Sequence, residues 1–169
     1  MIIWLTHDIA DLQNIARANG YHEFISMQNF YNLLYREEER EMIPYCQHAG
    51  LGIIPWSPIA RGVLARPYNS RATSRAESDK SIDALIRSQE TESDRMIVQR
   101  VEEIAIKHGV SMAKVAAAWT LKKGCCPIMG LNTKERIDEA VEIVNWHLPD
   151  EDARYLEEPY RAKFVVGHC

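Results

Sequence analysis

The amino-acid sequence predicts an α/β fold, on three observations. Short apolar segments alternate with segments of helical period along the 169 residues. Glycine, proline or polar clusters separate most of these segments. The composition, with 46% hydrophobic and 26% charged residues, is that of a globular domain with a core of its own. Strands that alternate with helices pair in parallel through right-handed crossovers, so we expect a parallel sheet whose strands are buried on both faces.

The first predicted helix covers residues 8–19. Ile9 and Ala16 fall on one side of it, and Gly20 stands where a left-handed glycine ends many helices. Residues 24–27 follow as the first short strand.

A run of charged residues at 36–41 has two interpretations, a surface interaction patch or the start of a helix. We favour a helix over residues 37–48, because acidic side chains stabilise a helix N-terminus. An interior proline costs ~3 kcal/mol or bends a helix, so we expect a bend near Pro44. Residues 51–54 form the second predicted strand.

Residues 66–93 are polar and rich in Ser, Arg, Asp and Glu. We interpret them as a surface loop with weak helical content around 81–88, since a connection of this length is usually functional or mobile. Two helices follow, one over residues 94–108 and one from a cap at Ser111 to residue 123.

The last part of the chain predicts a strand and two further helices. The strand covers residues 125–129. The final helix starts near Pro149, with the proline as its first residue and acidic residues directly after it in the first turn. Between them, residues 133–144 form a helix with a clear apolar face, which we expect to point into the core. That face consists of Ile137, Ala140, Val141 and Val144.

Composition argues against several classes of function. With 20 Lys and Arg against 24 Asp and Glu, the net charge of -4 is unlike that of a nucleic-acid binder. Without an apolar run of ~20 residues we expect no membrane span, and residues 1–5 lack the basic segment of a signal peptide. Four cysteines without CxxC spacing predict reduced thiols and a cytoplasmic protein. The histidines show no metal-ligand spacing.

Polar residues follow each of the three predicted strands, at the edge where α/β proteins bind ligands. Loops are polar in any case, so the pattern leaves open whether this edge is a ligand-binding rim or ordinary surface. The residues are, in chain order, Gln28, Asn29, Asn32, Trp56, Ser57, Arg61, Gly130, Asn132 and Thr133.

Two of these residue positions have specific alternatives. The helix start at Asn132 or Thr133 could bind a phosphate together with Arg136. Alternatively, Arg136 points into water or pairs with Glu135 or Glu139. Similarly, Trp56 is either a stacking platform for a planar ring or a core aromatic residue.

Several segments together resemble the aldo-keto reductase superfamily. Residues 26–34 (SMQNFYNLL) and 55–64 (PWSPIARGVL) resemble the ends of its sixth and seventh strands. Residues 111–119 (SMAKVAAAW) and 127–140 (PIMGLNTKERIDEA) are similar to the region of the eighth strand and its helix. Residues 156–160 (LEEPY) resemble the tail of the branch that includes potassium-channel β subunits and aryl-alcohol-type reductases.

The resemblance implies a partial (β/α)8 TIM barrel, about strands 6–8 with flanking helices. Residues 1–169 would be the C-terminal part of an NADP-dependent oxidoreductase domain, since a complete barrel typically takes about 250 residues. The implied reaction is hydride transfer between NADP(H) and an aldehyde or ketone.

The same resemblance implies a cofactor site. Gln28 would contact the nicotinamide carboxamide, and Trp56 would stack on the nicotinamide ring. The remaining contacts would come from two groups of residues. Ser57, Pro58, Ile59, Arg61 and Gly62 would line the pyrophosphate path, and Gly130, Asn132, Thr133 and Arg136 would hold the adenosine 2′-phosphate, with Glu139 near the adenine.

The superfamily's catalytic Asp, Tyr, Lys and His lie on its first four strands and have no counterpart in this sequence. His7, Asp8, Tyr31 and Lys80 supply the residue types without the motif contexts. Three hypotheses therefore stand: a carbonyl reductase represented by its C-terminal half, a non-catalytic cofactor-binding or interaction module, and a truncated product without independent activity. Since three strands leave both sheet edges unpaired, we expect self-association or pairing with a complementary half.

Overall fold

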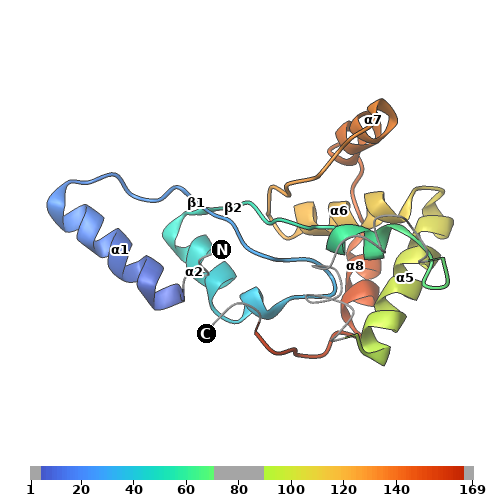
Figure 1. The fold of residues 1–169 in the computed structure, drawn as a ribbon, viewed down its shortest axis with the longest axis horizontal. Helices are drawn as coiled ribbons and strands as arrows, with labels where there is room; N and C mark the ends of the chain where they lie inside the picture. The colour runs from blue at the N-terminus through green and yellow to red at the C-terminus, as the bar shows by residue number, and fades with distance from the viewer. Residues whose placement is uncertain (1–4, 71–89, 166–169) are drawn as a thin grey trace.

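The computed structural model describes residues 5–70 and 90–165, and it has the expected α/β character (Figure 1). Most of the predicted loop at 66–93, including its helical content at 81–88, lies outside the described residues. The elements in chain order are α1 (Thr6–Asn19), β1 (Ser26–Met27), the 3-10 turn η1 (Glu37–Glu39), α2 (Met42–Ala49), β2 (Gly52–Ile53), the 3-10 segment η2 (Ala60–Ala65), α5 (Glu92–His108), α6 (Met112–Lys122), α7 (Lys134–Ile143) and α8 (Asp150–Glu157).

The two strands pair in parallel, as predicted, with Ser26 opposite Gly52 and Met27 opposite Ile53. The predicted third strand at 125–129 is reduced to a single parallel bridge between Ile128 and Trp56. Its backbone nevertheless runs alongside β2, because the Cys126 and Ile128 N–H groups donate to the Ile53 and Pro55 carbonyls, each at 2.8 Å. The three segments therefore lie next to one another in chain order.

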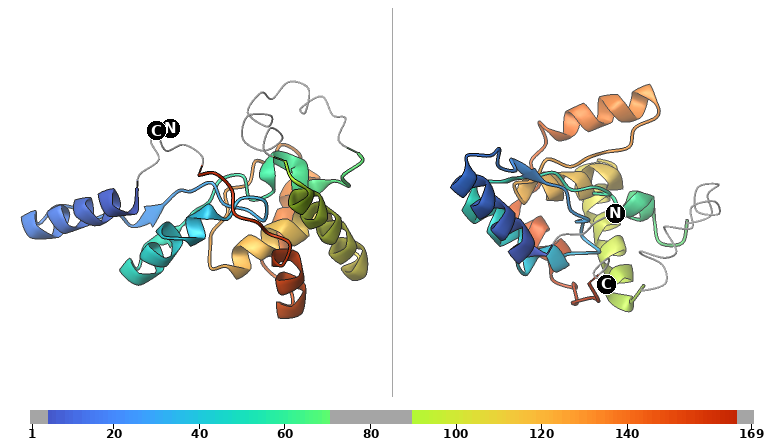
Figure 2. Two further views of the ribbon diagram at one scale, coloured as in Figure 1. Left: turned by 90° about the horizontal axis from the view of Figure 1, so that it is seen from below. Right: turned by 60° about the vertical axis from the view of Figure 1, so that its left-hand side comes forward.

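The strands are buried on one face only, which corrects the expectation of two buried faces. In Figure 2 (left), helices α2, α6 and α8 lie on one side of the strands. Ile53 faces this layer and is buried, whereas the alternating residues Ser26, Gly52 and Cys126 are exposed. Helices cover the other face of a doubly wound sheet, and the described part of this chain places none there.

Most predicted helices form where the sequence places them. Gly20 ends α1 in the left-handed conformation (φ 66°). The Ser111 hydroxyl caps α6 by accepting from the Lys114 N–H. The start of α5 lies two residues before the predicted one, because Thr91 and Asp94 form a capping box.

Two predictions near prolines are wrong. The helix expected over 37–48 is a 3-10 turn followed by the separate helix α2, and Pro44 lies in the first turn of α2, where it lacks no helical hydrogen bond. Pro149 is the N-cap of α8 rather than its first residue. Both prolines therefore lie at the start of a helix, and neither lies in a helix interior where it would bend the helix.

The core lies where α5 packs against α6 and α8, with η2 against α6. Trp119 of α6 is fully buried there, as are Ile97 and Val101 of α5 and Leu156 of α8. Three of these residues, Ile97, Val101 and Trp119, lie within the helices that the sequence predicted over 94–108 and 111–123.

Helix α7 stands apart from the remaining helices (Figure 1). Its predicted apolar face does not enter the core: Ile137, Val141 and Val144 are 48%, 63% and 69% exposed, and of the helix only Ile143 is buried. This face borders an apolar groove of about 470 Å³ between α6, residues 126–131 and α7. Among the described helices, none has the length and hydropathy that a membrane span requires.

Candidate functional site

Strand pairing gathers the three predicted strand ends at one edge. Trp56 lies in the middle, since it forms parallel bridges to Phe30 on one side and to Ile128 on the other. Its backbone N–H donates to the Asn29 carbonyl at 2.8 Å. The sequence interpretation of a shared edge is therefore geometrically correct for the residues directly after the strands.

Trp56 is the end of an aromatic stack. Its ring packs on Phe30 with centroids 4.4 Å apart and an interplanar angle of 25°, and Phe30 packs in turn on Tyr35 at 4.9 Å. Phe30 and Tyr35 are buried, while Trp56 is half-buried. Trp56 thus packs against the core through Phe30 but is only partly buried, so its burial lies between the two alternatives drawn from the sequence.

The first strand end offers one exposed and two buried amides. Gln28 is exposed. Asn29 is buried, and its Nδ2 donates to the Glu38 Oε2 at 2.7 Å. Asn32 is fully buried; its Nδ2 donates to the Ser57 carbonyl at 3.1 Å, and its Oδ1 accepts from the Leu34 N–H at 2.9 Å. Asn32 therefore holds the second strand end against the first, a role that the sequence did not indicate.

The second strand end has an unusual backbone. Ser57, Ala60 and Arg61 have φ values of 55°, 48° and 54°, and Gly62 follows at 97°. Non-glycine residues in this region cost of order 1–3 kcal/mol each and cluster at ligand sites. The N–H groups of Ala60 and Gly62 donate to the Ser57 and Ile59 carbonyls, each at 2.9 Å, so these turns hold the loop in its left-handed conformation.

Side-chain burial divides this loop into an anchored and a more open part. Pro58 is buried and Ile59 packs against the core, so both fix the loop rather than present polar groups. The Arg61 side chain and Gly62 are partly exposed. Arg61 and Gly62 are therefore open to a ligand.

The third strand end leads into the start of α7. Thr133 is its N-cap, and the Thr133 Oγ1 accepts from the Arg136 N–H at 3.4 Å. The Arg136 side chain is exposed to water, as one alternative expected, and its Nη1 donates to the Asn132 Oδ1 at 2.8 Å, not to Glu135 or Glu139. Gly130 and Arg136 are exposed, and Glu139 is half-buried. A Cβ at Gly130 would meet no atom within 4 Å, so packing against the rest of the chain does not require glycine at this position.

The start of α7 already holds an anionic group. Hydrogen bonds from its own backbone N–H and from Thr133 lower the pKa of the exposed Glu135 carboxyl. A carboxylate at this position is stabilised by the helix dipole and the first free N–H groups. Phosphate oxygens have the same acceptor chemistry, so the predicted anion site has the required donors.

Two groups that could suggest catalysis are unsuited to it. Tyr31 is fully buried and donates to the Glu39 Oε1 at 2.5 Å, and burial together with that carboxylate raises its pKa. His7 is an exposed residue of α1 beside Asp8. Lys80 lies outside the described residues. Within residues 5–70 and 90–165, no cluster of three or more metal-ligating side chains is found.

Comparison with known proteins gives a single family. The model of the aldo/keto reductase family matches residues 6–161. Versiconal hemiacetal acetate reductase of Aspergillus parasiticus is 59% identical over 155 residues, which are 91% of this chain and 45% of that protein. A putative aryl-alcohol dehydrogenase of Schizosaccharomyces pombe is 50% identical over 155 residues, 91% of this chain and 43% of that protein. The chain thus spans a little less than half the length of the curated relatives it matches.

Proposed function

Because the chain belongs to the aldo/keto reductase family, we propose that its three strand ends form the NADP(H)-binding edge of a carbonyl reductase. The observation that carries the proposal is Trp56, which is held between Phe30 and Ile128 by pairing, is stacked on Phe30, and is half-buried at the edge. Gln28 lies at the neighbouring strand end. An aromatic platform beside an exposed amide suits a planar ring that carries a carboxamide.

The residues present fit the charged parts of this cofactor. The partly exposed Arg61 and Gly62 suit the pyrophosphate, since arginine supplies charged donors and glycine allows close approach of the backbone. The N-terminus of α7 and the Arg136 guanidinium suit a 2′-phosphate, which would replace the Glu135 carboxylate, the Thr133 hydroxyl and the Asn132 amide as acceptor for these donors. When bound, NADPH would supply the hydride for reduction of an aldehyde or ketone.

We further propose that residues 1–169 correspond to the C-terminal part of the domain, about strands 6–8 of a (β/α)8 barrel. Parallel neighbours in chain order with helices on one side support this, since barrel strands follow one another in the same way. The buried Tyr31 cannot reach a substrate at the edge, so it does not supply a proton there.

A non-catalytic cofactor-binding module is the second candidate, and the same sequestered Tyr31 favours it. General acid catalysis contributes ~10²–10⁴-fold to rates. We therefore expect the 169-residue chain to bind NADPH and to reduce carbonyl compounds at most very slowly. A polypeptide that also contains the family's catalytic residues should show NADPH-dependent reduction.

Titration with NADPH and NADH, followed by cofactor fluorescence, tests the binding proposal. Arg136→Ala should weaken NADPH binding about tenfold and leave NADH binding unchanged, because a charged hydrogen bond to the 2′-phosphate is lost. Lys134→Ala is the matched control, since this neighbouring cation pairs with Asp138 at 2.9 Å. Absence of any fluorescence change with the unmodified chain up to millimolar NADPH contradicts the proposal.

A further inference from the structure

The 3-10 turn η1 joins three separate parts of the molecule. Its three consecutive glutamates each contact a different segment: Glu37 contacts the C-terminal segment 159–163, Glu38 contacts the first strand end, and Glu39 contacts the core. The charged run was interpreted from the sequence as a solvated helix start. Its actual partners lie as far as 126 residues away in the chain.

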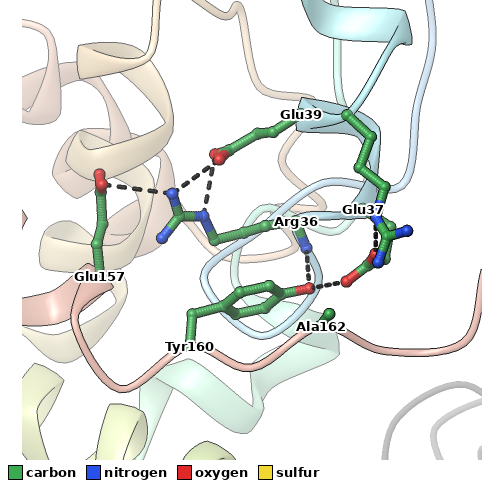
Figure 3. Close-up of a pocket in the computed structure, with 7 residues that line it drawn as sticks. Arg36, Glu37, Glu39, Glu157, Tyr160 and Ala162 are labelled. Carbon is green, nitrogen blue, oxygen red and sulfur yellow. Dashed lines mark hydrogen bonds and ion pairs between the residues drawn. The ribbon is translucent and has the colours of Figure 1, made fainter.

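The C-terminal segment is bound through Tyr160 (Figure 3). The Tyr160 hydroxyl accepts from the Arg36 N–H at 2.8 Å and donates to the Glu37 Oε1 at 2.7 Å. The Lys163 N–H donates to the same Glu37 oxygen at 2.7 Å. Since the Glu37 side chain is only 2% exposed, these donors replace the water that the carboxylate would otherwise need.

Arg36 holds the turn from the other side. Its guanidinium donates to both oxygens of Glu39, at 3.0 and 2.7 Å, and to Glu157 at 3.4 Å (Figure 3). It also lies over the Trp119 and Tyr160 rings, 5.6 and 5.2 Å from their centroids. The turn is therefore fixed to α6, α8 and the C-terminal segment together.

The middle glutamate of the turn reaches the candidate site. The Glu38 Oε2 accepts from the Nδ2 of the buried Asn29 at 2.7 Å. Asn29 follows Gln28 directly, and its carbonyl accepts from the Trp56 N–H at 2.8 Å. Tyr160 is thus connected to the backbone that carries Gln28 and Trp56 by hydrogen bonds at Glu37 and at Glu38, two adjacent residues that the covalent backbone of the turn joins.

We propose that Tyr160 and Glu38 are positioning residues, through which the docked C-terminal segment fixes Gln28 and Trp56 in the geometry that binds the nicotinamide. The inference rests on the proposed function for the identity of the ligand. The hydrogen-bonded connection itself is independent of it. Neither residue contacts the ligand: each acts through Asn29 and the strand end.

Two readouts on the full 169-residue chain test the inference. The first is amide deuterium exchange of residues 28–34 and 54–58, and the second is the dissociation constant of NADPH. Tyr160→Phe should raise exchange in these segments and weaken NADPH binding about threefold to tenfold, as expected for loss of a buried hydrogen bond to a carboxylate. Glu38→Gln should have a smaller effect than Glu38→Ala, because glutamine retains the acceptor for Asn29.

Tyr155→Phe provides the matched control. It removes the hydroxyl of a tyrosine on the neighbouring helix α8. This hydroxyl donates to Glu103 at 2.6 Å on the exposed surface. Exchange in residues 28–34 that is equal in Tyr160→Phe and Tyr155→Phe overturns the inference, as does unchanged NADPH affinity in Tyr160→Phe and Glu38→Ala. If exchange rises as expected but the unmodified chain binds no NADPH, the positioning role stands and the proposed function fails.

Discussion

Asp152 connects the end of α5 to the start of α8. Its carboxylate is buried and lies 2.7 Å from the Lys107 Nζ and 2.6 Å from the His108 Nε2. Burial opposes ionisation of Asp152, but the hydrogen bonds with Lys107 and His108 outweigh it and lower its pKa. The ionised form is therefore the one that stabilises this contact between two core helices.

Asp152→Asn should lower the free energy of unfolding at pH 7 by about 1–3 kcal/mol, the cost of a lost charged hydrogen bond in a buried site. A carboxyl with a lowered folded pKa stabilises above its unfolded value of about 3.9, and this contribution disappears as the pH falls through the folded value. Urea unfolding at pH 7 and pH 3 should show the difference from the unmodified chain shrinking at pH 3.

Asp150→Asn is the control for this prediction. Asp150 lies in the same first turn and pairs with Lys122, but it is exposed, and such pairs contribute little. An equal effect of the two substitutions at pH 7 would show that the burial of Asp152 is not responsible.

Single residues were predictable where their position after a strand was informative. Gln28, Trp56 and Gly130 could be assigned to one edge because parallel strands end on the same side. The clamp from Asn32 to Ser57 could not, since its partners lie 25 residues apart in the chain. The left-handed conformation of three non-glycine residues in the loop also has no sequence signal, as such residues rarely adopt it.

The start of α5 illustrates what sequence can specify for an element. The Thr91 Oγ1 accepts from the Asp94 N–H, and the Asp94 carboxylate accepts from the Thr91 N–H at 2.8 Å. This is the reciprocal pattern of a capping box, and its threonine-to-aspartate spacing is readable from the sequence. The helix spans 17 residues and forms a large part of the core, so its start has a direct bearing on stability.

Thr91→Ala should lower the free energy of unfolding by about 1 kcal/mol, the usual cost of losing an N-cap side chain. Thr91→Ser retains the hydroxyl and should be close to neutral. Chemical denaturation of both variants measures the difference. Equal destabilisation by alanine and serine would mean that the threonine methyl group, not the cap, stabilises the helix start.

Elements whose form depends on distant partners were predicted less well. The acidic run at 36–41 has helix-start composition, but Tyr160 and Lys163 bind Glu37 and hold the segment as a 3-10 turn. The apolar face of α7 has a clear helical period, yet period does not say which surface it meets. In this chain it borders a groove instead of the core.

At the scale of the whole molecule, apolar surface remains uncovered at one end of the strand layer. Ile128 is 45% exposed beside the groove of α7, and one face of the strands lacks a helix in the described part of the chain. Large exposed apolar patches and strand edges mark surfaces that bind other polypeptides. The relatives that this chain matches are more than twice as long as the matched region, which is consistent with a surface that a longer polypeptide covers.

We expect the 169-residue chain to self-associate through this groove. Light scattering after size exclusion should show a mass that rises with concentration, and Val144→Lys should shift it toward the monomer because it places a charge on the apolar face. Ile106→Lys is the matched control: Ile106 is 74% exposed on α5, outside the groove. A monomer at all concentrations with cooperative unfolding would contradict the prediction. Of these two residues, Val144 borders the groove and Ile106 does not. An equal shift in mass for both variants would therefore assign the association to general surface hydrophobicity.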